Sequence, residues 1–145
     1  NMKILLLVLG LLTITAFAAH EIQVNSADDI LRHLQGNNYN IYLIHFFESA
    51  KNDQATVSTN KDLQTAMNKI LSSNPDFFHA TIDLSQHELT RLGSIIGLTS
   101  TPSILLIVHG KGVWVSGQSA DLVTERLRDF LPKFVQASAH HSNPY

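Results

Sequence analysis

The side chains most able to do chemistry lie in a charged stretch between an apolar run and a helix-like run. Glu48, Lys51 and Asp53 occupy this stretch, and His45 lies in the apolar run just before it. Histidine can act as a general base near neutral pH, and a buried lysine can act as a nucleophile. However, a histidine in an apolar strand is typically a hydrogen-bonded core residue, and the neighbours of Lys51 are polar. A solvated charged loop is the simpler interpretation, and an enzyme that uses His45, Lys51 or Glu48 stays an alternative.

The composition excludes several kinds of chemistry. The chain has 145 residues and no cysteine, so thiol–disulfide exchange, which requires a thiolate, is excluded. Its formal charge of −2 gives no electrostatic case for binding nucleic acid or anionic lipid. Phosphate loops, dinucleotide fingerprints and zinc spacings are missing from the sequence. We therefore predict a non-enzymatic protein without a cofactor or a metal.

The N-terminal segment has the pattern of a secretory signal peptide. Lys3 is followed by an almost unbroken apolar run and by the small residues Ala16, Ala18 and Ala19. We predict that residues 1–19 are a signal peptide and that the mature domain enters the endoplasmic reticulum lumen or is secreted. The alternative is an uncleaved anchor over residues 4–19. That segment has 16 residues, whereas a spanning helix requires about 20.

Apolar periodicity and turn residues divide the rest of the chain into alternating strands and helices. Apolar runs or polar–apolar alternation favour strands, and apolar residues at helical spacing favour helices. Ser26 is placed to cap the first helix. Ser58-Thr59-Asn60 suggests a kink or a fresh N-cap in the second, and Pro132 is expected to close the last. Glycines 110 and 112 indicate a hairpin turn. The predicted strands are 21–24, 41–47, 77–83, 103–108 and 113–115, and the predicted helices are 27–35, 54–71, 86–96 and 119–131.

This order predicts one α/β domain. Strands separated by helices and followed by a terminal hairpin give a mixed central sheet with helices on both faces. We assign residues 20–134 to the domain and residues 135–145 to a flexible tail, because the tail is short, polar and rich in histidine.

Four motifs in this order resemble the thioredoxin family. They are the strand that ends Ile44-His45-Phe46-Phe47, the strand end Thr81-Ile82-Asp83, the loop Gly97-Leu98-Thr99-Ser100-Thr101-Pro102-Ser103, and the hairpin around Gly110-Lys111-Gly112 with Gly117 before the last helix. The match covers residues 21–134 and implies a thioredoxin-like fold. It also implies that the Thr101–Pro102 peptide bond is cis.

The departures from the family pattern bear on function. By the resemblance, Lys51 and Gln54 stand where the family has its two active-site cysteines, and His45 stands where many members keep a buried aspartate. The fold therefore does not bring the activity with it. In the family, the residue before the cis-proline offers its backbone to an extended peptide, and here that residue would be Thr101. The alternative is that Pro102 only shapes the loop.

We therefore predict a redox-inactive thioredoxin-like domain of the secretory pathway that binds a protein or polypeptide, as an accessory subunit or a chaperone-like module. Trp114 is an additional candidate contact, although it suits the core equally well. If the anchor is not cleaved, the alternative is a membrane-anchored supernumerary subunit of a membrane complex. Its domain would then lie in the lumen, and the chain would touch the membrane only through residues 4–19. The candidate partner-binding residues are Glu48, Ser49, Lys51, Asn52, Asp53, Thr101 and Trp114.

Overall fold

The computed structural model describes residues 19–35 and 38–142 of the chain. The predicted signal peptide or anchor therefore lies outside the described residues, apart from Ala19. Of the helices in the described ranges, none is long and apolar enough to cross a membrane.

Five strands form one mixed sheet in the order β1-β3-β2-β4-β5. The first three positions in this order are parallel neighbours, and β4 and β5 run antiparallel to the strands beside them. The predicted mixed sheet is confirmed. The strands are β1 (His20–Glu21), β2 (Ile41–Phe47), β3 (Phe78–Asp83), β4 (Ser103–Val108) and β5 (Lys111–Val115).

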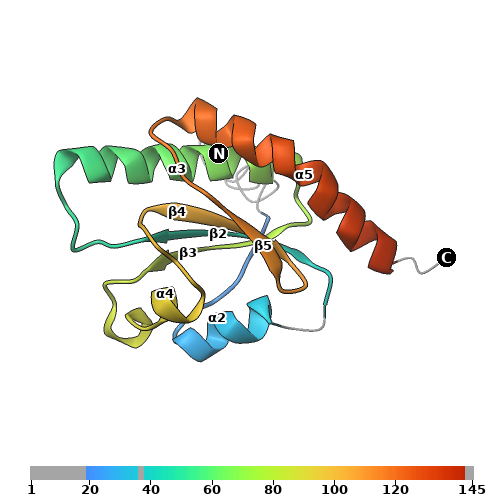
Figure 1. The fold of residues 1–145 in the computed structure, drawn as a ribbon, viewed down its shortest axis with the longest axis horizontal. Coiled ribbons are helices and arrows are strands. Elements are labelled where there is room, and N and C mark those ends of the chain that lie inside the picture. Colours follow the sequence, from blue (N-terminus) through green and yellow to red (C-terminus); the bar gives the residue numbers. More distant parts are fainter. Residues whose placement is uncertain (1–18, 36–37, 143–145) are drawn as a thin grey trace, which may run out of the picture.

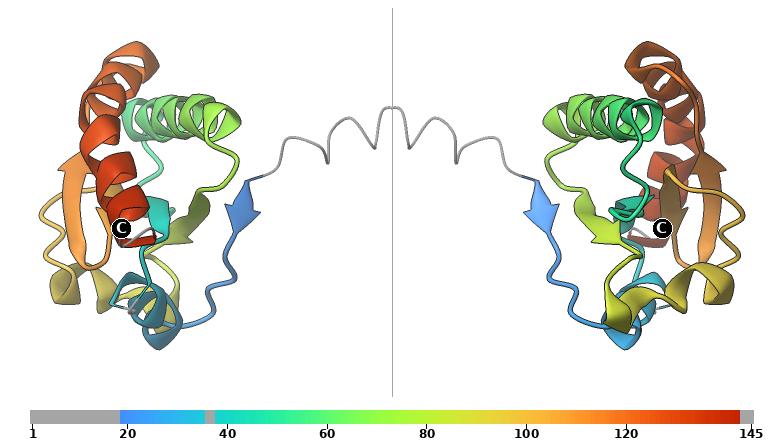
Figure 2. Two further views of the ribbon diagram at one scale, coloured as in Figure 1. Left: turned by 90° about the vertical axis from the view of Figure 1, so that its right-hand side faces the viewer. Right: turned by 90° about the vertical axis from the view of Figure 1, so that its left-hand side faces the viewer.

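Helices cover both faces of the sheet, as predicted. Figure 1 shows α3 and α5 on one side and α2 and α4 on the other, and Figure 2 shows the same two layers from the ends. The helices are α2 (Ala27–Leu34), α3 (Gln54–Ser73), α4 (Leu92–Ile95) and α5 (Ala120–Ser142), with a short 3-10 turn at His87–Leu89.

The alternation of side chains along β2 divides the core into two apolar clusters. Ile41 and Leu43 pack with α3 and α5, whereas Tyr42, Ile44 and Phe46 pack on the opposite face. Successive strand residues point to opposite faces, so His45 lies on the face that α3 covers. Leu43 and Ile44 are fully buried, and each such side chain stabilises the fold by roughly 1.5–3 kcal/mol.

Several local predictions are confirmed. Ser26 caps α2 by accepting a hydrogen bond from the backbone N–H of Asp29 at 3.3 Å. The β4–β5 hairpin turns at His109 and Gly110, whose φ angles of 48° and 76° are both positive, whereas Gly112 lies in β5 opposite Ile107 and not in the turn. Positive φ at two consecutive residues is the geometry of the tight hairpin turn whose twist matches that of its strands.

Three local predictions are wrong. α3 is one continuous helix through Ser58-Thr59-Asn60, without a fresh N-cap there, and the Thr59 hydroxyl donates to the Ala55 carbonyl inside the helix at 3.0 Å. The predicted helix over 86–96 is instead the 3-10 turn followed by the four-residue α4. α5 runs through Pro132 to Ser142 instead of ending at Leu131.

The extension of α5 has a packing explanation. Proline removes one backbone hydrogen bond but permits the helix to continue when packing favours it. Phe134 and Ala137 pack against the core, and the Ser138 hydroxyl donates to the Tyr39 carbonyl at 2.6 Å. The predicted mobility of residues 135–145 stays a prediction, and residues 143–145 lie outside the described residues.

Candidate functional site

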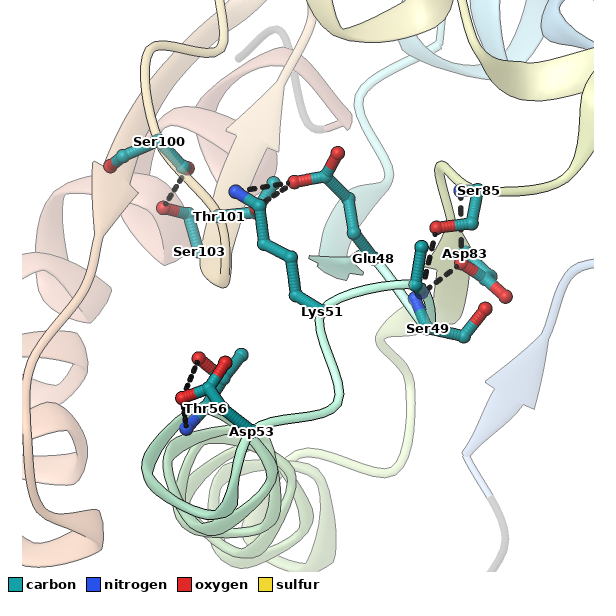
Figure 3. Close-up of polar contacts among 11 residues, drawn as sticks. Glu48, Ser49, Lys51, Asp53, Thr56, Asp83, Ser85, Ser100, Thr101 and Ser103 are labelled. Atoms are coloured by element: carbon teal, nitrogen blue, oxygen red, sulfur yellow. Dashed lines mark hydrogen bonds and ion pairs between the residues drawn. The ribbon is translucent and has the colours of Figure 1, made fainter.

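The candidate site lies at the end of β2, where the chain leaves the sheet and enters α3. Residues 48–53 form the connecting loop, and the loop before β4 approaches it from the other side (Figure 3). Because β2 pairs with both β3 and β4, the ends of all three strands meet here. Segments far apart in the sequence are therefore held together by the register of the sheet.

Three of the predicted residues form a closed polar cluster. The Lys51 ammonium lies 2.7 Å from Glu48 Oε2 and donates to the Thr101 hydroxyl at 3.1 Å. The Thr101 hydroxyl in turn donates to Glu48 Oε2. The hydrogen bonds from Lys51 and Thr101 favour the charged carboxylate, and they lower the pKa of Glu48. This cluster ties the 48–53 loop to the loop before β4.

The predicted cis peptide bond between Thr101 and Pro102 is present. The loop is closed by the Ser103 hydroxyl, which donates to the Ser100 carbonyl at 2.9 Å. Thr101 itself is only partly buried. Within the described part of the chain, neither its backbone N–H nor its carbonyl forms a backbone hydrogen bond. The Thr101 backbone therefore has one donor and one acceptor left for another chain.

The other side of the 48–53 loop is fixed to the end of β3. The Ser49 N–H donates to Asp83 Oδ1 at 2.9 Å, and the Ala50 N–H donates to the Ser85 hydroxyl at 3.0 Å. Burial opposes ionisation of Asp83, but the hydrogen bonds from Ser49 and Ser85 outweigh it and lower the pKa of Asp83. Ser49 thus contributes to this arrangement through both its side chain and its backbone N–H.

Asp53 has a structural role at the start of α3. Its carboxylate accepts from the Thr56 N–H at 3.1 Å and from the Thr56 hydroxyl at 2.9 Å. These hydrogen bonds lower the pKa of Asp53 and satisfy one of the free N–H groups of the first turn. Gln54 follows as the first residue of the helix, and both Asn52 and Gln54 are exposed.

His45 lies beneath this loop in a hydrogen-bonded network that the sequence did not reveal. Its side chain is 2% exposed, and its Nδ1 lies 3.0 Å from Gln64 Oε1. The same oxygen accepts from the Thr81 hydroxyl at 3.0 Å. Burial disfavours the imidazolium more than the Gln64 hydrogen bond favours it, so the pKa of His45 is lowered. No local sequence pattern links these three residues.

Trp114 is separate from the cluster. Its ring meets Phe46 edge-on, with centroids 5.5 Å apart, and it packs on the edge of the apolar cluster covered by α2 and α4. The structure therefore joins Glu48, Lys51 and Thr101, uses Ser49 and Asp53 to fix the backbone, and places a partly buried Trp114 at the edge of the core.

Comparison with known proteins identifies the fold. No protein-family model matches the sequence, and neither does any curated protein. The structure is similar to thioredoxin O2 from Arabidopsis thaliana, with a TM-score of 0.61, 9% identity and coverage of 77% of this chain and 94% of that one. It is also similar to thioredoxin f2 from Chlamydomonas reinhardtii, with a TM-score of 0.58, 11% identity and coverage of 79% and 98%.

A third similar structure is the thioredoxin from Trypanosoma brucei brucei, with a TM-score of 0.57, 15% identity and coverage of 80% and 93%. These likenesses establish a thioredoxin-like fold. Because the chain has no cysteine, it lacks the Cys-x-x-Cys motif and its thiol–disulfide chemistry.

Proposed function

We propose that this domain binds extended polypeptide through the surface formed by residues 48–54 and the Thr101–Pro102 loop, without redox chemistry. The observation that carries the proposal is the Thr101 backbone, whose N–H and carbonyl have no backbone partner within the described residues. An extended chain beside this loop would receive one hydrogen bond and give another, as in the addition of a strand to a sheet.

The polar cluster supports the same proposal by fixing the loop in advance. Lys51 and Glu48 hold the Thr101 side chain, and Ser103 closes the loop on its other side. A loop that is ordered before binding loses less conformational entropy when a partner docks. The Glu48–Lys51 ion pair is partly exposed, so it also offers both signs of charge to side chains of the bound polypeptide.

Binding to a permanently unfolded chain tests this proposal. The probe is reduced, carboxymethylated α-lactalbumin, and its affinity is measured by fluorescence anisotropy at two salt concentrations. Thr101→Arg places a long side chain over the unpaired backbone groups, and we expect it to weaken binding at least tenfold. Thr65→Arg is the matched control, because Thr65 is an exposed residue of α3 and the substitution adds the same charge.

Two results would contradict the proposal. The first is an affinity for the probe that neither Thr101→Arg nor Thr65→Arg changes. The second is no detectable binding of the probe by the folded wild-type protein. Circular dichroism spectra and unfolding midpoints of the three proteins establish that each is folded.

We further propose that the domain acts in the secretory pathway, as a lumenal or secreted accessory or chaperone-like module. The support is the apolar run at residues 4–12 and the small residues that end at Ala19. Expression of the full chain in a secreting cell, followed by intact-mass measurement, tests this. A mature chain that begins near His20 supports a signal peptide, and a retained segment in the membrane fraction supports the anchored alternative.

A further inference from the structure

An open cavity of about 300 Å³ lies at the opposite end of the sheet from the proposed polypeptide surface. It is formed between the C-terminal half of α5, the β4–β5 hairpin and Tyr39, which precedes β2. β4 begins at Ser103, next to the Thr101–Pro102 loop, and ends at Val108, which lines the cavity. The whole length of β4 therefore separates the cavity from that loop.

The interior of the cavity is largely apolar. Val108 is buried, and Phe134 and Ala137 of α5 pack against the core cluster to which Val108 belongs. Phe134 and Ala137 are three positions apart, so they lie on the same face of the helix. The Tyr39 ring stacks on the His109 ring, with centroids 4.2 Å apart and an angle of 20° between their planes. These aliphatic and aromatic groups offer an organic ligand a surface to bury.

Two lysines bring positive charge to this cavity from different elements. Lys111, the first residue of β5, pairs with Val108 across the hairpin, so both side chains point to the face that α5 covers. Lys133 lies four positions before Ala137 on α5 and therefore on the same face of that helix. Both lysines line the cavity and are exposed. Neither forms an ion pair within the described part of the chain.

We propose that this cavity binds a small amphipathic carboxylate, with its apolar body inside and its negative charge at the two lysines. A lysine stem can cover apolar surface while its ammonium group stays in water, so both charges can gather at the mouth of the cavity. An anion at the mouth would be attracted by Lys111 and Lys133, whereas a cation would be repelled. A neutral molecule of the same shape would bury the same apolar area without this attraction.

The proposal does not depend on polypeptide binding and goes beyond it. NMR titration with phenylbutyrate, phenylbutyramide and phenylbutylamine tests it, because the three molecules share an apolar body and differ in charge. We expect millimolar binding of the carboxylate, about fivefold tighter than that of the amide, because ion pairs with exposed lysines are individually weak. The amine should bind more weakly than the amide. Added salt should remove the advantage of the carboxylate over the amide.

The location of the ligand and the role of the charges can be tested separately. Phenylbutyrate should shift the methyl signals of Val108 and Ala137 through the ring current of its phenyl group. Lys111→Met and Lys133→Met together keep the apolar stems and remove both charges, so they should lower the affinity for phenylbutyrate about fivefold and leave that for the amide unchanged. Lys61→Met is the matched control, because Lys61 is an exposed lysine of α3 that also forms no ion pair with a described residue.

Thr101→Arg should weaken polypeptide binding without affecting phenylbutyrate, which separates this proposal from the one above. Equal affinities for the carboxylate and the amide at low salt would overturn the proposal. An equal loss of affinity in Lys61→Met and in the double variant would do so too, as would no binding of phenylbutyrate by the folded wild-type protein. Methyl shifts that leave Val108 and Ala137 unmoved would place the ligand elsewhere and would also overturn it.

Discussion

Replacing His45 by leucine should remove a pH-dependent part of the stability. The imidazole is 2% exposed, and its burial lowers its pKa, whereas in the unfolded chain it titrates near the ordinary value of 6.5. Just below pH 6.5 the unfolded state therefore binds more protons than the folded state. The free energy of unfolding contributed by His45 is complete above the unfolded pKa and is lost as the pH falls below it toward the lower pKa of the folded state.

The size of this effect follows from the single proton involved. One group can change the free energy of unfolding by at most about 1.4 kcal/mol per pH unit. At pH 6.5 half of the unfolded molecules carry the proton, so if the folded ring is neutral the slope is about 0.7 kcal/mol per unit. The difference between wild type and His45→Leu should show this slope, because the contributions of the other groups cancel.

The absolute stability at pH 8 gives a second check. The leucine variant loses one hydrogen bond to Gln64, worth about 1 kcal/mol, but Thr81 still donates to the same oxygen. It also removes a buried Nε2 without a partner among the described residues, a cost of about 1–3 kcal/mol. The variant should therefore be as stable as wild type or more stable at pH 8.

Urea unfolding at intervals between pH 5.5 and 8 measures both quantities. A difference between the two proteins that is flat across this range would refute the inference that the folded protein holds His45 neutral. Wild-type stability that increases relative to the leucine variant as the pH falls would have the wrong sign and would refute it as well.

Three further substitutions test the loops around the site. Lys51→Met should raise the pKa of Glu48 toward its ordinary value in a carbon-13 titration. Because the ion pair is partly exposed, the same substitution should change the free energy of unfolding by less than about 1 kcal/mol. An unmoved pKa of Glu48 would contradict the cluster. Asp53→Ala should lower the thermal midpoint and Asp53→Asn should largely restore it, because either side chain caps α3; equal midpoints would argue against the cap. Gly112→Ala places a Cβ 3.0 Å from the Leu106 carbonyl oxygen, so it should lower the free energy of unfolding measured in urea by about 1–3 kcal/mol. An unchanged free energy of unfolding would contradict the close approach of the β5 backbone to β4.

Much of the fold could be predicted because its signals are local. The continuous apolar run of β2 indicates a central strand, and Ser26 followed by two aspartates indicates the start of α2. The cis bond before Pro102 came from the family resemblance rather than from any local signal, since most X–Pro bonds are trans.

The local predictions failed where tertiary contacts decide the outcome. The polar stretch in the middle of α3 stays helical because the following turns of the same helix bury Leu63, Ala66 and Met67 in the core. Pro132 does not end α5, because Phe134 and Ala137 extend the packing beyond it. In both places the sequence carries an unfavourable local signal that longer-range packing overrides.

The candidate site was predictable only in part. Glu48, Lys51 and Thr101 could be named from the sequence, but their closed cluster depends on the antiparallel pairing of β2 with β4. The environment of His45 was hidden, because Gln64 and Thr81 come from a helix and a strand with no shared pattern. Side-chain networks of this kind follow from the fold and not from the spacing of residues along the chain.

The central claim is that the Thr101 backbone holds an extended polypeptide in a domain without thiols. Amide chemical-shift mapping with carboxymethylated α-lactalbumin tests it most directly, since it locates the bound chain and needs no substitution. We predict that the largest shifts fall on Thr101, Ser103 and residues 48–54, with the Thr101 amide moving downfield as it donates a new hydrogen bond. Shifts confined to α2 or α5, with the Thr101 amide unmoved, would contradict the account.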